Sequence, residues 1–176
     1  MTFRETTLPG VWLIDPDVFA DDRGAFVRAW VRDEFAEHGL ETDLVQGAIA
    51  TNRMRGTIRG LHYQVAPHGQ AKLVRAIRGR VFDVAVDLRP DSPTYRQWLG
   101  VELDSDNRRM LYLPRGIAHG YQTLTDDAEV FYFVSAAYAP DHQQGLRWND
   151  PAIGITWPLG PPTAINDRDA SYPDLS

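Results

Sequence analysis

Two of the five histidines in this sequence have settings typical of side chains that move protons. His62 lies in the stretch TIRGLHYQ (57–64) and His119 in LPRGIAHGY (113–121), each after a glycine-containing turn and in a strand-like context. An imidazole can be neutral or charged near pH 7, so either ring has the chemistry of a general base or acid. A lone histidine on a strand is more often structural, but two in similar contexts favour a functional role. The remaining three, in a helix-like end or in loops rich in Pro, Gly and Gln, are expected at the surface: His38, His68 and His142.

The only lysine is the third candidate. Of 18 basic residues, 17 are arginine and one is Lys72. A general bias towards arginine accounts for the excess, but it does not explain why one lysine remains. A compact ammonium with a tunable pKa cannot be replaced by a guanidinium. The composition therefore indicates a functional role for Lys72.

Other kinds of chemistry lack their usual residues. The sequence has no cysteine, and it contains no GxGxxG, phosphate-binding P-loop, GxSxG or HExxH motif. Disulfides, thiolate metal sites and cysteine nucleophiles are excluded, and Rossmann-type hydride transfer, ATP hydrolysis, serine esterase chemistry and zincin chemistry lose their support. A net charge of −6 and a pI near 5.3 argue against binding nucleic acid or an anionic membrane. No apolar stretch approaches the roughly 20 residues that span a bilayer, and the N-terminus lacks a signal-peptide pattern, so a cytoplasmic location is expected.

A metal site is the main alternative for the two histidines. The spacing PxGxxH at 114–119 resembles the second motif of cupins, whose first motif normally supplies HxH and a glutamate as ligands. The corresponding place reads His62-Tyr63-Gln64 here. His62, Gln64 and His119 form a poor ligand set because a neutral amide replaces a stronger donor. We expect no metal, and a metal-dependent cupin enzyme stays the rival.

The elements that must position these residues are short strands. Apolar and polar residues alternate over short runs separated by Gly, Pro, Asp and Asn, which is typical of a β-sandwich or small barrel. The expected strands are 11–14, 25–30, 44–50, 57–63, 72–77, 81–88, 98–103, 109–113, 119–124 and 129–138. One helix is expected at 31–38, and the tail after Trp157 shows no pattern of its own. Together they predict one domain, 1–176, with an N-terminal strand arm and an irregular C-terminal tail.

The clearest strand carries an acidic residue that has two interpretations. In RVFDVAVDLR (80–89), Phe82, Val84 and Val86 point one way, and Asp83 points the other. In an open sheet the acidic face would meet solvent. In a barrel the same alternation would place Asp83 inside a polar pocket.

Many stretches resemble the dTDP-4-dehydrorhamnose 3,5-epimerase family, in order and over nearly the whole chain. They are DDRGAF (21–26), RGLHYQ (59–64), AKLVR (71–75), GRVFDVAVDLR (79–89), DSPTY (91–95), LPRGIAHG (113–120), WNDPAIGITWP (148–158) and NDRDA (166–170). The resemblance implies a mainly β fold, a cupin or double-stranded β-helix jelly-roll barrel with short peripheral helices. It also implies a homodimer that uses no metal or cofactor and acts on nucleotide-linked 4-keto-6-deoxy sugars.

Epimerisation beside a ketone requires a base on one face, a cation or donor at the ketone oxygen and an acid on the other face. His62 is the candidate base, and the resemblance implies that Asp169 orients it. Lys72 would stabilise the enolate oxygen. The resemblance further implies that Tyr132 is the proton donor on the far face, although a tyrosine within Phe131-Tyr132-Phe133 is otherwise more often a packing residue.

The resemblance also supplies a binding set. Arg23, Arg59 and Arg168 are expected near the diphosphate, which guanidinium groups bind in a bidentate way. Tyr138 is expected to stack on the nucleobase. The Arg23 region is expected to reach into the partner subunit's pocket. The remaining expected contacts are Phe26, Gln46, Asp83 and His119.

The sequence departs from the family pattern around base recognition. Arg28 stands in place of a glutamate, Ala48 in place of an asparagine and Gln143 in place of another glutamate. The loss of a carboxylate and an amide removes hydrogen-bond partners that could distinguish one nucleobase from another, so CDP- or GDP-linked sugars stay open beside dTDP sugars. No residue decides between inversion at carbons 3 and 5 and inversion at one of them. A catalytically silent sugar-binding cupin is a further rival, although a pure binder needs neither an acid nor a base.

Overall fold

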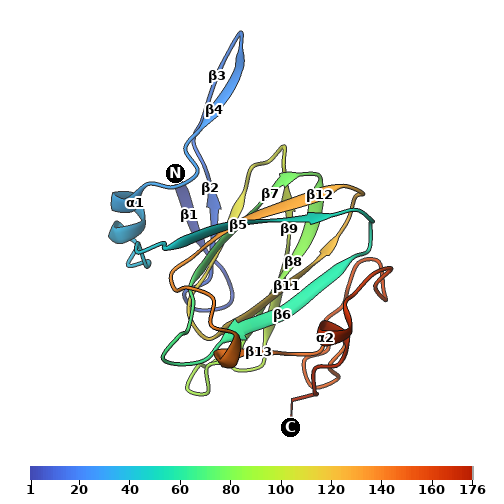
Figure 1. Cartoon of the computed structure of the whole chain (residues 1–176). Coiled ribbons are helices and arrows are strands. Elements are labelled where there is room, and N and C mark those ends of the chain that lie inside the picture. Colours follow the sequence, from blue (N-terminus) through green and yellow to red (C-terminus); the bar gives the residue numbers. More distant parts are fainter. Residues whose placement is uncertain (176) are drawn as a thin grey trace.

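The chain folds into two antiparallel sheets that face each other (Figure 1). The computed structural model describes residues 1–175. The first sheet has, in spatial order, β1 (Thr2–Glu5), β2 (Trp12–Asp15), β10 (Met110–Leu113), β7 (Lys72–Arg78), β12 (Ala128–Val134) and β5 (Gln46–Asn52). The second has β13 (Gln143–Gly145), β6 (Ile58–Gln64), β11 (Ile117–Thr123), β8 (Arg80–Asp87) and β9 (Trp98–Asp104).

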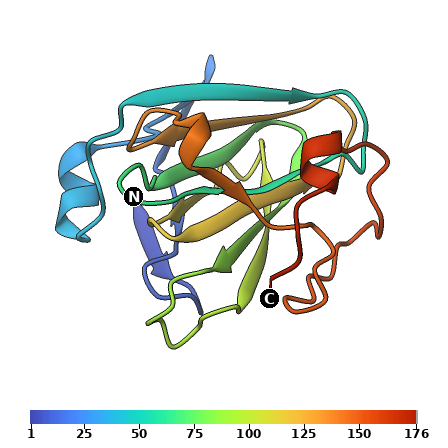
Figure 2. The same cartoon turned by 60° about the horizontal axis from the view of Figure 1, so that its bottom comes forward.

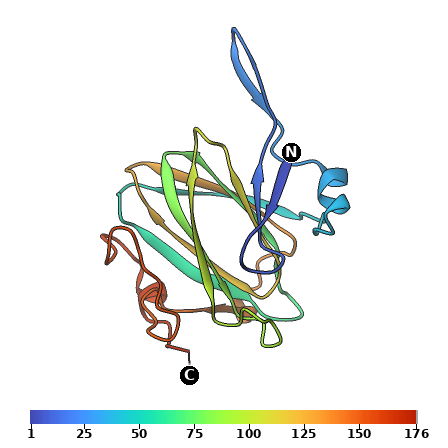
Figure 3. The same cartoon turned by 180° about the vertical axis from the view of Figure 1, so that it is seen from behind.

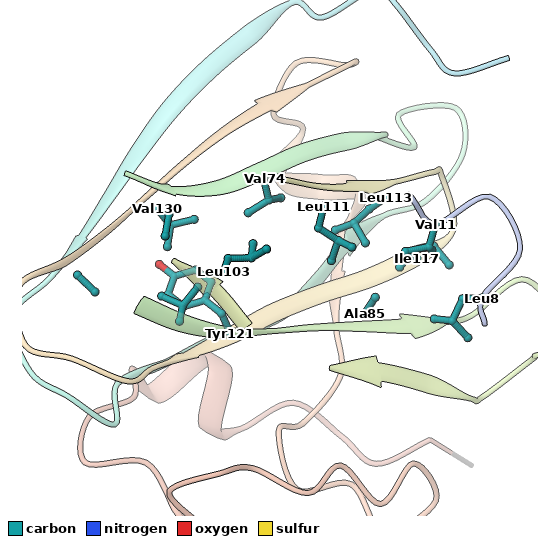
Figure 4. Packing of buried hydrophobic residues seen from close by; sticks show 13 residues of the cluster. Leu8, Val11, Val74, Ala85, Leu103, Leu111, Leu113, Ile117, Tyr121 and Val130 are labelled. Atoms are coloured by element: carbon teal, nitrogen blue, oxygen red, sulfur yellow. The ribbon is translucent and has the colours of Figure 1, made fainter. Parts of the chain in front are cut away.

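Apolar side chains from both sheets fill the space between them. Figure 4 shows Val74, Leu111 and Val130 of the first sheet packed opposite Leu103 and Tyr121 of the second. Each is almost fully buried, and burial of a large apolar side chain stabilises a fold by about 1.5–3 kcal/mol. The prediction of a mainly β barrel is therefore confirmed, and the barrel interior is a packed core at this end.

Strand β8 settles the two interpretations of its alternation in favour of the barrel. Asp83 is fully buried and points into the barrel, like its neighbour in alternation Ala85. The apolar residues Val84 and Val86 lie on the other face, where they join a second buried cluster. The alternation was thus predicted correctly, and the more apolar face is the outer one.

The C-terminal segment covers that outer face. Leu146, Ile153 and Trp157 pack against it, and Figure 2 shows the segment, in orange and red, running along one side of the sheets. The expectation of a tail without regular structure needs a correction. The segment contains the short helix α2 (Asp167–Ala170), which lies beside β6.

A two-stranded hairpin stands away from the sheets near the N-terminus (Figures 1 and 3). It consists of β3 (Val18–Asp21) and β4 (Gly24–Val27), so the strand predicted at 25–30 begins one residue earlier and ends three residues earlier. The ring of Phe26 is 67% exposed and faces no core of its own chain. Since the hairpin rests on few contacts, its apolar residues remain open to another molecule.

Helices are few and short. The predicted helix at 31–38 is confirmed as α1 (Arg32–Glu37), which buries Phe35, and η1 (Pro140–His142) is one turn of 3-10 helix. Strand β12 ends at Val134, four residues before the predicted end, and strands β1, β3 and β13 were not predicted. Within residues 1–175, no helix has the length and apolar character needed to cross a bilayer.

Candidate active site

A cavity of about 310 Å³ opens between the two sheets beside the packed core, and Tyr121 of that core contributes to its wall. Both sheets contribute to its walls, because β6 and β11 come from one and β5, β7 and β12 from the other. Eight of the residues that the sequence singled out line it: Gln46, Arg59, His62, Lys72, His119, Tyr132, Tyr138 and Arg168. Asp83 and Asp169 lie directly behind two of these residues.

His62 and Asp169 form a hydrogen-bonded pair across 107 residues of sequence. The Nε2 atom of His62 lies 2.8 Å from Oδ1 of Asp169, whose Oδ2 accepts the backbone N–H of Gly60 at 2.9 Å. Asp169 is 1% exposed, whereas the His62 side chain is 25% exposed and faces the cavity. The aspartate therefore orients the ring and holds it against the cavity wall.

The surroundings of this pair favour a neutral His62 and an ionised Asp169. Burial lowers the pKa of His62 below its ordinary value, against the opposing effect of Asp169, and Lys72 and Arg168 lower it further. Burial works against the ionised form of Asp169, but the hydrogen bonds from His62 and Gly60 dominate and lower its pKa. A neutral imidazole must donate Nε2–H to this carboxylate, which leaves Nδ1 as the basic nitrogen.

Two glycines bring His62 and His119 side by side. His62 lies opposite His119 in the β6–β11 ladder, so the two rings lie on the same face of the sheet. A Cβ atom on Gly60 would lie 2.6 Å from the Cα of Gly120, and one on Gly120 would lie 2.6 Å from the carbonyl oxygen of Arg59. Only glycines permit the two strands to approach this closely.

His119 has its own carboxylate. Its Nε2 atom lies 3.0 Å from both carboxylate oxygens of Asp83, and both side chains are buried. The pair lies deeper than the His62 pair, since His119 is 8% exposed at the side chain. Asp83, which points into the barrel, is thus paired with His119 at the cavity wall.

Lys72 connects the two walls. It extends from β7, and its Nζ donates to the backbone carbonyl oxygen of His62 on β6 at 3.2 Å. Burial lowers the pKa of Lys72 to about 8, with a smaller opposing effect from Asp83. An ammonium with so few water contacts stabilises nearby negative charge strongly.

Tyr132 faces the cavity from the wall opposite His62. It lies on β12 of the first sheet, between Val74 of β7 and Ala48 of β5, whereas His62 belongs to the second sheet. The small side chain of Ala48, which departs from the family pattern, is the strand neighbour of this tyrosine. Imidazole and phenol thus line one cavity from different sheets.

Arginines and polar groups surround the cavity mouth. Arg59 is held by Asn52, whose Oδ1 accepts its Nε–H at 2.7 Å. Arg168 donates to Oε1 of Gln143 at 3.4 Å, and the phenol of Tyr138 lies beside its guanidinium. Since two guanidinium groups open onto one mouth, the site suits an anion with several oxygens.

Two predicted binding residues lie outside this cavity. Arg23 and Phe26 are on the β3–β4 hairpin, and the Arg23 side chain is 90% exposed and paired with Asp21. Arg28, at the foot of the hairpin, pairs with Asp17 at 2.8 Å and approaches Glu34 at 3.8 Å. Arg28 therefore anchors the hairpin to α1 and does not line the cavity of its own chain.

The rival metal triad fits poorly with the contacts of its members. The amide of Gln64 donates to the carbonyl oxygens of His68 and Ala137, and its oxygen accepts the N–H of Ala139 at 2.8 Å. Nε2 of each histidine is already bonded to a carboxylate. In the part of the chain that the structure describes, no three His, Asp or Glu side chains form a cluster suited to a metal ion.

Sequence reasoning missed the residues that hold this site in place. Asn166 caps α2, and its Oδ1 accepts the N–H of Asp169 at 2.7 Å. The stretch Asn166-Asp167-Arg168-Asp169 has an N-cap residue followed by acidic residues, which is a recognisable helix start. Tyr121, which also lines the cavity, is held by Asn52, and burial raises its pKa to about 12.

Comparisons with known proteins agree on one family. The family model described as dTDP-4-dehydrorhamnose 3,5-epimerase matches residues 5–176. A protein of that name from Sinorhizobium fredii is 42% identical over 175 residues, covering 99% of this chain and 90% of the relative.

Solved structures give the same result. A dTDP-4-dehydrorhamnose 3,5-epimerase from Bacillus anthracis with TDP and PPi bound has a TM-score of 0.95 at 40% identity, covering 99% of both chains. A 3′-monoepimerase from Streptomyces bikiniensis in complex with dTDP-quinovose has a TM-score of 0.90 at 34% identity, covering 96% of this chain and 85% of that one. The chain described here belongs to the dTDP-4-dehydrorhamnose 3,5-epimerase family.

Proposed function

We propose that this protein epimerises dTDP-4-dehydro-6-deoxyglucose at carbons 3 and 5 to give dTDP-4-dehydro-L-rhamnose. The observation that carries the proposal is the arrangement of His62 and Tyr132, which line one cavity from different sheets, with Lys72 between the walls. Base, cation and acid are the three parts that inversion beside a ketone needs. The family of the chain supports the same reaction.

Each inversion is two proton transfers. The Nδ1 atom of His62 takes the proton from the carbon beside the ketone, and the electron pair of that C–H bond moves to the ketone oxygen. The Lys72 ammonium stabilises the resulting enolate, and the Tyr132 hydroxyl returns a proton to the opposite face. Solvent then takes the proton from the imidazolium and supplies one to the phenolate. No atom changes oxidation state overall, so the reaction itself calls for no redox carrier.

Asp169 has a supporting part in this scheme. Its carboxylate fixes the tautomer with Nε2–H and stabilises the imidazolium that forms during the reaction. The buried pair of His119 and Asp83 offers a second donor to the sugar from the same wall. Because this pair lies deeper, it suits the ring hydroxyls or the ketone oxygen rather than the diphosphate.

The nucleotide is proposed to bind at the mouth. Arg59 and Arg168 would hold the diphosphate, the exposed ring of Tyr138 would stack on thymine, and Gln46 would hydrogen-bond to it. The TDP and dTDP-quinovose complexes of the two similar structures support a thymidine nucleotide.

The active unit is proposed to be a homodimer in the cytoplasm. The hairpin that carries Arg23 and Phe26 exposes charge and apolar surface together, which suits insertion into a second copy. Arg23 would then add a third guanidinium to the partner's diphosphate site, with Phe26 beside the nucleotide. A cytoplasmic location suits an enzyme whose substrate is a charged nucleotide sugar.

Solvent exchange tests the proposed function. The protein is incubated in deuterium oxide with dTDP-4-dehydro-6-deoxyglucose, and NMR reports the label at each carbon. We expect deuterium at carbons 3 and 5, with the same protein exchanging CDP- and GDP-linked analogues far more slowly. An absence of label at both carbons would contradict the proposal.

Inversion at carbon 3 alone is the second candidate. It is favoured by one observation, the 34% identity and TM-score of 0.90 with a 3′-monoepimerase. Label confined to carbon 3 in the same experiment would support it over the double epimerase.

A further inference from the structure

One carboxylate oxygen in the active site has two nitrogen atoms beside it, one from an imidazole and one from a guanidinium. Oδ1 of Asp169 lies 2.8 Å from Nε2 of His62 and 3.7 Å from Nε of Arg168. Arg168 immediately precedes Asp169 on α2, so the same turn of helix places both groups. Arg168 therefore contacts the pair of His62 and Asp169 as well as the cavity mouth.

The other partners of Arg168 do not neutralise its charge. Its Nη1 donates to the neutral amide of Gln143, and its second neighbour is the phenol of Tyr138. The guanidinium is 54% exposed, so it adds positive charge to the site and is not locked into a buried ion pair.

This extra charge answers a difficulty in the proposed reaction. Asp169 favours the protonated form of His62, and a bound diphosphate would add two negative charges that favour it further. A protonated imidazole cannot accept a proton from the sugar. A cation beside Asp169 opposes both effects.

We propose that Arg168 is a positioning residue for the base: by sharing Oδ1 of Asp169 with His62, it keeps His62 unprotonated while the anionic substrate is bound. This inference rests on the proposed function, and it gives Arg168 a role beyond contact with the diphosphate. The pKa of His62 supports it, because Arg168 is among the groups that lower that pKa.

The charged and titratable groups around His62 come from several elements. They are Arg59 and Tyr63 on β6, Lys72 on β7, His119 on β11, Tyr132 on β12, Tyr138 after it, Arg168 and Asp169 on α2, and Tyr172 after that helix. Lys72 is the other cation that lowers the pKa of His62, but it contacts the backbone carbonyl of His62 and is part of the proposed catalytic machinery. Arg168 is the cation that a substitution can neutralise without removing a reacting group.

The first test separates binding from the effect on the base. Arg168→Gln removes the charge, and Arg168→Lys keeps it. We expect both variants to raise KM at every pH, because the diphosphate contact is altered. In Arg168→Gln alone, we expect kcat to fall on the order of fivefold more at pH 6 than at pH 8. The reason is that His62 would have a higher pKa in this variant, so more of it would be protonated and unable to act as a base at pH 6. A kcat profile of Arg168→Gln that has the same shape as the wild-type profile would overturn the proposal.

The second test needs no turnover. NMR titration of the His62 imidazole in the free protein should give a higher pKa in Arg168→Gln than in wild type, and a wild-type value in Arg168→Lys. Arg59→Gln is the matched control, because Arg59 lines the same mouth but is held by Asn52 rather than Asp169. An unchanged pKa in Arg168→Gln would overturn the inference even if the protein proves to be an epimerase. A raised pKa without any exchange of the keto sugar would instead contradict the proposed function and leave the coupling in place.

Discussion

His62 and Lys72 lie on facing walls of the cavity, and the proposed reaction needs them in different charge states. In the proposed mechanism, His62 must be neutral to accept a proton, and Lys72 must be charged to stabilise an enolate. Burial lowers the pKa of both, in the case of Lys72 to about 8. The pH range in which both conditions hold therefore lies around neutrality.

This pair predicts a bell-shaped pH profile of kcat/KM. Activity should rise as His62 loses its proton, at a pH below the ordinary 6.5 of histidine, and fall as Lys72 loses its proton near pH 8. Initial rates from pH 5 to 9.5 measure both limbs, which belong to the free enzyme. A profile that stays flat through pH 9 would contradict the role of Lys72.

The buried charge of Lys72 should lower the stability of the folded protein. Lys72→Met should therefore melt at a higher temperature than wild type, although it should lose epimerase activity. Below about pH 8, folding removes a charged ammonium from water, and the full cost is present. Between about pH 8 and the unfolded value near 10.5, the folded chain has lost this proton and the unfolded chain retains it, so wild-type stability rises with pH. We expect the variant to gain roughly 1 kcal/mol, or about 3 °C in Tm, at pH 7 and this advantage to shrink towards pH 10.5. A variant that melts at or below the wild-type temperature at pH 7 would show that the buried charge carries no such cost.

Some residues of the candidate site could be predicted from the sequence, and others could not. Lys72 stood out because every other basic residue is an arginine, so composition alone indicated it. Asp169 is indistinguishable in sequence from a surface aspartate in a turn, and its burial depends on a tail that docks beside a distant strand. Only the resemblance to a family pointed to it.

At the level of elements, the C-terminal segment brings the carboxylate of Asp169 to His62, the proposed base. Its apolar residues cover the outer face of β8, and α2 then places Asp169 behind β6. Tyr172 packs so closely over Gly145 that a Cβ atom there would meet the ring at 2.1 Å. The docking of this segment is therefore a condition for an oriented base.

Asn166→Ala should lower kcat with a fall of at most about 3 °C in Tm. The substitution removes the cap that accepts the N–H of Asp169, at a cost of about 1 kcal/mol confined to a four-residue helix. We expect kcat to fall on the order of tenfold, because a loosened carboxylate orients His62 less well. Asn107→Ala is the control, since the side chain of Asn107 also accepts a backbone N–H, that of Arg109 two residues on, in a turn outside the cavity. Equal kcat values in the two variants would show that the Asn166 cap does not contribute to orienting His62.

The elements also show what alternation can and cannot predict. In β8 the alternation separated the two faces of the strand correctly. The face with Asp83 points into the barrel, and the more apolar face is buried under the C-terminal tail. Strand β3 escaped prediction because all four residues are exposed, so no buried partner in its own chain imposes a pattern. Information about a second molecule is absent from the local sequence of one chain.

At the scale of the whole molecule, the projecting hairpin exposes two residues that the proposed function places at the binding site of another subunit. Arg23 and Phe26 lie outside the cavity of their own chain, although the family resemblance assigns both to the binding site. An isologous dimer in which each hairpin enters the other subunit's pocket would reconcile these facts.

Mixing two impaired variants tests this arrangement. Arg23→Ala lacks the hairpin contact and His62→Ala lacks the base, so each homodimer should be impaired. In a mixed dimer, one pocket keeps His62 and receives an intact hairpin from the other subunit. Co-refolded equal mixtures should therefore regain roughly a quarter of wild-type activity, because half the dimers are mixed and each has one intact pocket. Activity that only averages the two homodimers would show that Arg23 serves its own subunit or neither.

The central claim is that His62 and Tyr132 transfer protons at opposite faces of one bound sugar. It is tested most directly by NMR in deuterium oxide with dTDP-4-dehydro-6-deoxyglucose, comparing His62→Ala and Tyr132→Phe with wild type and with His68→Ala, an exposed histidine outside the cavity. We predict that both active-site variants fold normally and incorporate deuterium into inverted product at least 100-fold more slowly, on the order expected for loss of a general acid or base, while His68→Ala matches wild type. Incorporation at the wild-type rate in either His62→Ala or Tyr132→Phe would contradict the claim.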